Sequence, residues 1–130
     1  VDVLYRLLSE RPPESFVSHK SLPTPEEHAR FVASRPFLYW YLIAREEQFI
    51  GALECTDRNE IGISVFKFFQ RHGVAGEALE LFFSQHEPLP AIPAVRNGAW
   101  VANVAPENNA SIEFFEKHGF KRIQNTMVRA

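Results

Sequence analysis

The chain has 130 residues, of which 45% are hydrophobic, a size that suits one hydrophobic core and is too small for two. Its formal net charge of -2 provides no basic field, so we expect neither nucleic acid nor a membrane as a partner. A lone cysteine excludes an intramolecular disulfide, and no apolar run approaches the roughly 20 residues that span a bilayer. We therefore expect a single domain over residues 1–130, located in the cytoplasm.

The first part of the sequence predicts two helices. Leucines recur at helical spacing within residues 1–9. Further along, Thr24, Pro25 and Glu27 combine a capping hydroxyl, a proline suited to the first helical position and a carboxylate three residues after the cap. We therefore expect a second helix to begin here and to end before Pro36.

An antiparallel meander of three strands is expected next. Residues 37–45 and 48–56 are aromatic and β-branched runs, and the short Glu46-Glu47 link between them is typical of a hairpin. After a polar turn, residues 60–66 alternate well enough to predict a third strand.

The segment after this third strand is rich in small and basic residues. It reads Gln70-Arg71-His72-Gly73-Val74-Ala75-Gly76. A helix begins inside this loop, so amide N–H groups can converge there before helical hydrogen bonds use them. Small residues let a diphosphate approach the backbone, and Lys67, Arg71 and His72 are near enough to add positive charge. Packing needs alone can produce the same pattern, so the loop by itself does not decide between the two interpretations.

The remaining elements complete an alternating order. A proline-rich loop spans residues 87–98, and residues 99–104 predict a short apolar strand at the centre of the sheet. Residues 108–118 predict a helix that Gly119 closes, and a last strand is expected from Phe120. The order α-α-β-β-β-α-β-α-β predicts a layered α/β sandwich.

Two motifs, in this order, resemble those of the GNAT N-acetyltransferase superfamily. The family's acyl-CoA loop reads Gln/Arg-x-x-Gly-x-Gly/Ala, which residues 70–75 fit. The second motif begins a helix at Asn108, includes Ser111 and Phe115, and ends in Gly-Phe. The resemblance implies a GNAT fold, in which a mixed central sheet is splayed at the cofactor site and helices cover both faces. It also implies acetyl-CoA as the cofactor.

The resemblance carries a set of cofactor-binding residues with it. Val65 stands five residues before Gln70, which is the spacing of the splayed strand whose backbone binds the pantetheine arm. The residues expected to bind acetyl-CoA are Val65, Lys67, Gln70, Arg71, His72, Gly73, Val74, Ala75, Gly76, Asn108, Ser111 and Phe115. Asn108 has a second interpretation as a helix cap, and both roles are compatible.

The sequence departs from the family pattern in two ways. Relative to the family, the sheet is expected to lack its first strand and to be shortened at its last. Either a second copy of the chain covers the exposed sheet edge as a homodimer, or the natural protein extends beyond these residues. Phe115 stands where many relatives have a tyrosine that protonates the departing thiolate. Because a phenyl ring cannot donate a proton, water or another donor must do so, or the domain is a poor catalyst.

Candidate catalytic and acceptor-binding residues follow from this frame. Glu60 either takes a proton from the substrate amine or is an idle turn carboxylate, and Asn103, in a strand expected to be buried, needs a polar partner that the cofactor gap could provide. His19 lies in the segment that lines the acceptor pocket in GNAT domains, and it either binds substrate or is an exposed loop residue. Trp40 and Tyr41 point to opposite faces of one strand, so only one can line a pocket; Trp40 is the candidate to bind substrate, with core packing as the alternative.

Other polar residues receive weaker assignments. Glu54 and Ser64 are lower-ranking pocket candidates, and His28, beside Phe31 on an apolar helix face, is expected to be a hydrogen-bonded structural histidine. Cys55 is expected to be a buried passive thiol. The histidines and this cysteine show no metal-ligand spacing, so no metal site is expected.

The expected function is acetyl transfer from acetyl-CoA to a primary amine, by direct attack on the thioester without a covalent enzyme intermediate. The acceptor is expected to be a small amino compound or an amino sugar. Two alternatives remain: a non-catalytic acyl-CoA binding or sensing module, which Phe115 makes credible, and a protein N-terminal acetyltransferase.

Overall fold

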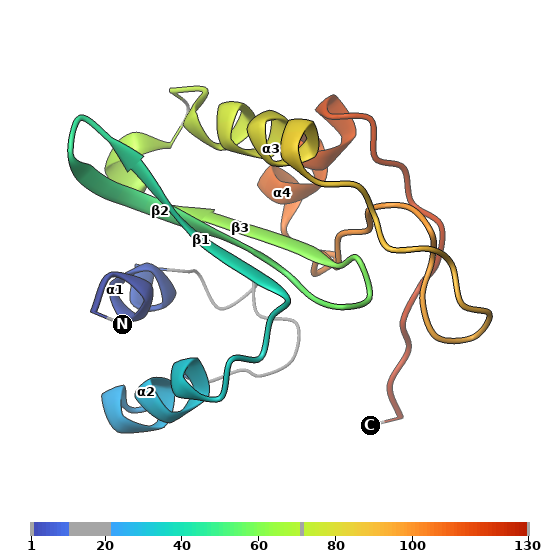
Figure 1. The fold of residues 1–130 in the computed structure, drawn as a ribbon, viewed down its shortest axis with the longest axis horizontal. Coiled ribbons are helices and arrows are strands. Elements are labelled where there is room, and N and C mark those ends of the chain that lie inside the picture. Colours follow the sequence, from blue (N-terminus) through green and yellow to red (C-terminus); the bar gives the residue numbers. More distant parts are fainter. Residues whose placement is uncertain (1, 11–21, 71, 130) are drawn as a thin grey trace.

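The computed structural model describes residues 2–70 apart from 11–21, and residues 72–129. Helices α1 and α2 cover one face of a sheet, and α3 and α4 cover the other (Figure 1). The helices are α1 (Asp2–Glu10), α2 (Pro25–Ala33), α3 (Val74–Gln85) and α4 (Asn109–Lys117), the strands are β1 (Tyr39–Arg45), β2 (Gln48–Cys55) and β3 (Ile61–Val65), and η2 (Lys67–Phe69) is a 3₁₀ turn. The predicted layered α/β architecture is confirmed.

The sheet is an antiparallel meander in the order β1-β2-β3, as predicted. The pair Arg45 and Gln48 closes the β1–β2 hairpin around Glu46 and Glu47. Both glutamates have left-handed backbone angles, with φ of 50° and 66°, the conformation that tight hairpin turns require.

The helix ends follow the sequence signals. The Thr24 hydroxyl accepts the N–H of Glu27 at 3.1 Å, and the Thr24 N–H donates to the Glu27 carboxylate at 2.9 Å, which is the predicted capping box of α2. Asn108 caps α4 by accepting the N–H of Ser111 at 3.2 Å. Gly119 follows α4 with a φ of 92°, so the predicted left-handed glycine is also confirmed.

The sheet is smaller than the sequence predicts. The expected strand at residues 99–104 is reduced to a single parallel bridge, in which Val101 donates to Asn59 O at 2.9 Å and accepts from Ile61 at 2.8 Å. Residues 120–129 form no strand. Beyond Phe120, the apolar side chains of that segment, Ile123 and Met127 among them, stay exposed, so little burial offsets the entropy cost of ordering a strand.

Asn59 explains why the chain returns to the sheet at Val101. Its side chain is almost completely buried, donates to Leu89 O at 2.9 Å and to Asn97 O at 2.6 Å, and accepts from the Leu89 N–H at 2.8 Å. These bonds hold the loop of residues 87–98 against the start of β3. The segment that carries Asn103 is thereby positioned beside Glu60.

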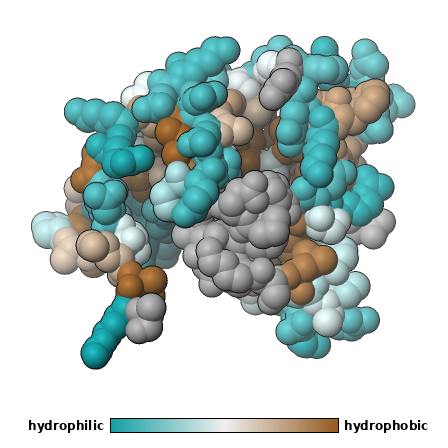
Figure 2. Space-filling model, turned by 180° about the vertical axis from the view of Figure 1, so that it is seen from behind, coloured by the Kyte–Doolittle hydropathy of each residue, from teal (hydrophilic) through white to brown (hydrophobic). Residues whose placement is uncertain are grey.

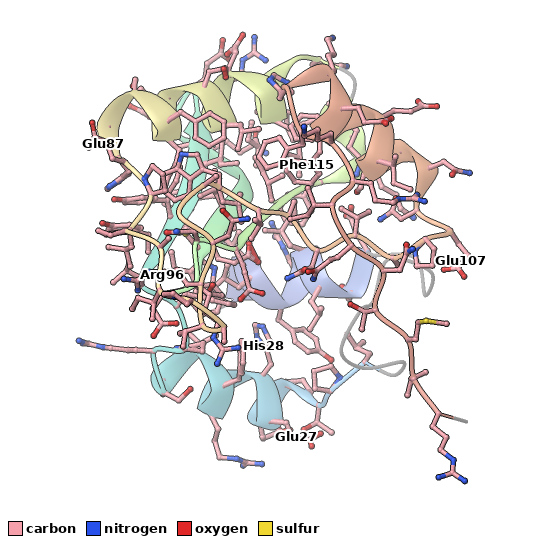
Figure 3. All side chains as sticks on the ribbon, turned by 90° about the vertical axis from the view of Figure 1, so that its right-hand side faces the viewer. Glu27, His28, Glu87, Arg96, Glu107 and Phe115 are labelled. Atoms are coloured by element: carbon pink, nitrogen blue, oxygen red, sulfur yellow. The ribbon has the colours of Figure 1, made fainter. Side chains whose placement is uncertain are left out.

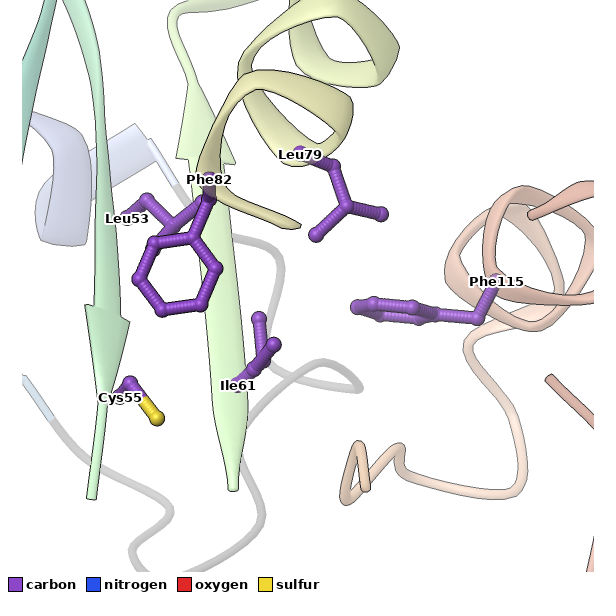
Figure 4. Packing of buried hydrophobic residues seen from close by; sticks show 6 residues of the cluster. All are labelled: Leu53, Cys55, Ile61, Leu79, Phe82 and Phe115. Carbon is purple, nitrogen blue, oxygen red and sulfur yellow. The ribbon is translucent and has the colours of Figure 1, made fainter. Parts of the chain in front are cut away.

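Apolar packing differs on the two faces of the sheet. Toward α3 and α4, one cluster joins Leu53, Cys55, Ile61, Leu79, Phe82 and Phe115 (Figure 4). Toward α1, a smaller cluster joins Leu7, Ala52 and Phe66. Alternate residues of β2 supply the two clusters, as the two-residue period of a strand requires.

The surface seen from behind is largely hydrophilic, with apolar side chains visible in smaller areas between the polar ones (Figure 2). Among the described residues, no helix combines the length and the apolar character needed to cross a membrane.

Candidate functional site

One edge of β3 is open over part of its length. Phe66 donates its backbone N–H to β2, so by alternation the backbone groups of Ile61, Ile63 and Val65 point away from β2. Ile61 bonds to Val101 at the start of the strand. Beyond this bridge, no strand of the described chain pairs with the outer edge of β3. On the strand that was predicted to be splayed, the outer backbone groups after Ile61 are therefore not used by another strand of the described chain.

The open edge leads to the start of α3, whose first amides have no acceptor among the described residues. Gly73 is the N-cap of α3, has a φ of 76° and provides no side-chain cap. The first helical hydrogen bond runs from Glu77 N–H to Gly73 O at 3.0 Å, so the preceding amides of Val74, Ala75 and Gly76 have no acceptor within the helix. A Cβ atom at Gly73 would meet nothing within 4 Å, so there is open space on that side of the N-cap residue. This geometry fits a diphosphate.

Side chains hold the loop that joins β3 to α3. Gln70 donates through Nε2 to Val65 O at 2.9 Å, and the backbone N–H of Lys67 donates to Glu10 Oε1 of α1 at 2.8 Å. Lys67 and His72 are exposed, so their side chains are available to an anion at the helix start. Arg71 lies outside the described residues.

Gly76 also has a packing role. A Cβ atom there would lie 3.0 Å from Nε2 of His118, so the missing side chain lets α4 approach α3 closely. The packing interpretation that the sequence left open therefore applies to Gly76, whereas open space surrounds Gly73.

The residues of the second motif are engaged within the fold. Asn108 and Ser111 bond to each other at the start of α4, which confirms the capping interpretation of Asn108. Phe115 is only 7% exposed and belongs to the core cluster, where its ring centroid lies 5.1 Å from that of Phe120. The described contacts of Phe115 thus give it a packing role, because α4 turns it toward the core. Cofactor contacts of these three residues stay predictions.

The two residues predicted to be catalytic lie together. Asn103 donates through Nδ2 to Glu60 Oε2 at 2.7 Å, and the Thr56 hydroxyl donates to Glu60 Oε1 at 2.9 Å. Contrary to the sequence prediction, Asn103 is exposed, because the strand expected to bury it does not form. Glu60 is half-buried, and each of its carboxylate oxygens has a partner, so it is not an idle turn residue in its contacts.

A pocket of about 540 Å³ lies between α1, α2 and the facing side of the sheet. Its aromatic corner consists of Phe31, Phe37 and Trp40, whose ring centroids are 4.7 to 6.0 Å apart. Trp40 thus lines the pocket, and its contact with a substrate stays a prediction. Tyr41 points to the other face, and its hydroxyl lies 2.8 Å from His86 Nε2. His19, the other predicted acceptor residue, lies outside the described residues.

Polar side chains from three elements also line this pocket. They are Glu27 and His28 of α2, Glu54 of β2 and Ser64 of β3. The Glu54 carboxylate lies over Gly62, where a Cβ atom would be 2.5 Å from Oε2. Sequence reasoning ranked Glu54 and Ser64 low because it could not assign their faces, and the strand register now places both toward the pocket.

His28 differs from its sequence prediction. It is buried, but Nδ1 has no hydrogen-bond partner among the described residues. Burial lowers the pKa of His28 below its ordinary value of 6.5, so the imidazole is neutral near pH 7. Because His28 lies on the apolar face of α2, the sequence indicated a packing role, whereas the structure places it in the wall of a pocket.

Cys55 is buried, and its burial raises the pKa of the thiol to about 11, in keeping with the predicted passive role. Within the described ranges, no group of three or more His, Cys, Asp or Glu side chains is arranged to hold a metal ion.

Comparisons with known proteins agree with this architecture. The sequence model of the acetyltransferase (GNAT) domain family matches residues 2–121. The ligand-free crystal structure of the aminoglycoside antibiotic 6'-N-acetyltransferase AAC(6')-IG from Acinetobacter haemolyticus is similar, with a TM-score of 0.62 and 17% sequence identity. The similarity covers 99% of this chain and 92% of that chain, whereas no curated protein matches. The predicted GNAT fold is confirmed.

Proposed function

The chain belongs to the GNAT acetyltransferase domain family, and from this membership we propose that it transfers an acetyl group from acetyl-CoA to a primary amine. One observation supports the binding of acetyl-CoA. The open edge of β3 leads directly to the start of α3, which has no side-chain cap. When bound, acetyl-CoA supplies an activated thioester, while its diphosphate carries the negative charge that a helix start favours.

Residues beside the open edge of β3 would bind two different parts of acetyl-CoA, its diphosphate and its amide-containing arm. The amides of Val74, Ala75 and Gly76 bind the diphosphate, and Lys67 and His72 add positive charge when protonated. The outward-facing backbone of β3 binds the amide-containing arm, with the Val65 N–H polarising the thioester carbonyl.

The acceptor would approach from the face that carries α1 and α2. Ser64 lines the pocket and lies on β3 between Ile63 and Val65, so the pocket adjoins the open edge. By strand alternation the side chain of Glu60 points to this same face. A neutral amine attacks the acyl carbon, the N–C bond forms as the C–S bond breaks, and Glu60 or a water held by it takes the amine proton.

We extend the proposal to the kind of acceptor. A small amino compound or an amino sugar fits a pocket of about 540 Å³ with an aromatic corner and polar walls. An amino sugar also agrees with the aminoglycoside after which the structurally similar acetyltransferase is named. The departing thiolate takes its proton from water or another donor, because Phe115 has none to give.

Phe115 also favours a second candidate function. A domain without a tyrosine at this position could bind acyl-CoA without transferring the acyl group. A measurement of acetyl transfer to an amine distinguishes the two functions, because a binding module would show no turnover.

Calorimetric titration with CoA tests the cofactor site through a matched pair of variants. Gly73 and Gly119 both have positive φ and open space where a Cβ atom would lie, so a glutamate at either position has the same charge and a similar backbone strain. Gly73→Glu places this charge at the amides and should weaken CoA binding at least about tenfold. Gly119→Glu should leave the affinity unchanged. Equal affinity in the two variants would exclude this site.

Release of free thiol from acetyl-CoA in the presence of a panel of primary amines tests transfer itself. Amine-dependent release that Gly73→Glu abolishes supports the enzyme. CoA binding without release for any amine would leave the binding module as the function.

A further inference from the structure

His28 is a buried polar residue whose hydrogen bonding is incomplete. Its side chain is 6% exposed, and Nδ1 has no partner in the described part of the chain. Two rings of the described chain lie near it, Tyr5 at 5.5 Å and Phe31 at 6.4 Å between centroids, and they provide apolar contact. The Tyr5 hydroxyl is already bonded to Pro23 O at 3.0 Å. An unpaired buried polar atom is costly, so its presence in a pocket wall points to a ligand.

The position of His28 separates it from the reacting end of the pocket. Figure 3 shows it on the side of α2 that faces α1 and the sheet. Its neighbour Phe31 packs on Trp40 of β1. In the sheet, β2 lies between β1 and β3. The open edge where acetyl transfer is proposed lies on the outer side of β3. A ligand group bound at His28 would therefore lie away from the amine that the proposed transfer acetylates.

We propose that His28 binds a second polar group of the acceptor, a hydroxyl or a second amino group that donates a hydrogen bond to the imidazole. The proposal rests on the proposed function and names a residue that determines which acceptor is preferred. The acceptor class becomes a primary amine that carries another hydrogen-bond donor, such as an amino alcohol, a diamine or an amino sugar.

Charge in the pocket agrees with a ligand of this kind. The imidazole is neutral near pH 7, so one of its nitrogens accepts a hydrogen bond. Glu27 and Glu54 line the same pocket, and none of its described lining residues is a lysine or an arginine. This surface suits hydroxyl and amino groups and disfavours an acceptor that carries a carboxylate or a phosphate.

Matched alkylamines test the proposal with the whole chain. The acceptors are straight primary amines of three to eight carbons whose far end is a methyl, a hydroxyl or a second amino group. With acetyl-CoA, we expect one chain length at which a hydroxyl or amino end lowers KM by about tenfold or more relative to methyl, because it satisfies His28. The kcat values should agree within about twofold, since the group lies away from the reacting amine.

Two substitutions connect this preference to His28. His28→Leu removes the polar atoms and should erase the difference by raising KM only for the hydroxyl and amino ends. His28→Asn keeps an amide oxygen near the position of Nδ1 and should retain part of the preference, and it serves if the leucine variant fails to fold. An unchanged preference in both variants, or an equal loss for all three chain ends, would overturn the assignment.

A binding measurement distinguishes this inference from the proposed function. Addition of the preferred amino alcohol without acetyl-CoA should shift the imidazole ¹⁵N resonances of His28, and His28→Leu should weaken its binding about tenfold or more. Such binding without acetyl transfer would remove the proposed function and leave the assignment of His28 intact. Transfer without any effect on His28, or no preference and no binding in the parent protein, would overturn the assignment.

Discussion

The two faces of the sheet are built from alternate residues of the same strands but have different properties. On the side of α3 and α4, Leu53 and Cys55 of β2 enter a closed cluster with Leu79 and Phe82 (Figure 4). On the side of α1 and α2, Glu54 of β2 lines a pocket. The first face therefore supplies packing energy, and the second leaves room for a ligand.

The largest effect expected is a loss of stability when a core residue on the side of α3 and α4 is truncated. Phe82 is almost completely buried, and its ring packs on Tyr39 at 5.9 Å and Trp100 at 5.2 Å. Phe82→Ala should lower the free energy of unfolding by about 3–5 kcal/mol, because it removes a large ring and leaves a cavity. Phe68→Ala, at a residue that is 82% exposed, should change it by less than about 0.5 kcal/mol. Urea denaturation of both variants measures the difference, and similar losses would contradict the division between the faces.

On the face that carries α1 and α2, loss of the proposed base should change activity more than stability. Glu60→Gln keeps an oxygen that can accept from Asn103 but removes the proposed base, so kcat should fall about 100-fold. The profile of kcat/KM against pH should shift to higher pH, because more of the amine must arrive deprotonated. Glu113→Gln, on the exposed side of α4, is the matched control and should keep the parent rate. A parent-like rate and pH profile for Glu60→Gln would show that Glu60 is not the base.

Two glycines of the central strands allow a test with one added methyl group. At Gly51 a Cβ atom would collide with the backbone oxygen of Ser64, so Gly51→Ala must shift β3 and should cost about 1–3 kcal/mol. At Gly62 it would collide with the Glu54 carboxylate, the end of a flexible side chain. Gly62→Ala should therefore cost less stability and should change KM for the amine by moving Glu54 within the pocket. Thermal unfolding and thiol-release kinetics measure both, and equal destabilisation would contradict this difference.

Features encoded by neighbouring residues could be predicted from the sequence. The Thr24 capping box, the Gly73 start of α3 and the Asn108 cap depend on hydrogen bonds or backbone angles within a few positions. The order of the elements follows from the spacing of apolar residues and from proline and glycine. These signals placed the open edge of β3 beside a helix start.

Features that depend on distant residues could not be predicted. Asn59 binds Leu89 and Asn97, which lie 30 and 38 positions away, and no local pattern distinguishes it from an ordinary turn residue. The strand expected around Val101 shrinks to one bridge because its length depends on a partner edge, and Asn103 becomes exposed as a result. His28 has the spacing of a core residue, and only the arrangement of α1, α2 and β1 shows that a pocket lies beneath it.

The smallest effect expected is a pH dependence of stability that comes from His28, on the face that carries α1 and α2. Burial lowers the pKa of His28 in the folded chain below 6.5, whereas the unfolded chain has the ordinary value. As pH falls from 6.5 toward the folded-state pKa, the unfolded chain binds more protons than the folded one, so the free energy of unfolding decreases. Above 6.5 this contribution to stability is fully present.

Two variants isolate this contribution from those of the other histidines. His28→Asn should show a smaller decrease in melting temperature between pH 7 and pH 5 than the parent, because it removes the buried imidazole. His72→Asn, at an exposed position on the α3 loop, should keep the parent decrease. Calorimetry across this range measures both slopes. If His28→Asn and the parent lose stability equally, protonation of His28 does not oppose folding, and its side chain must then be accessible to water from the pocket.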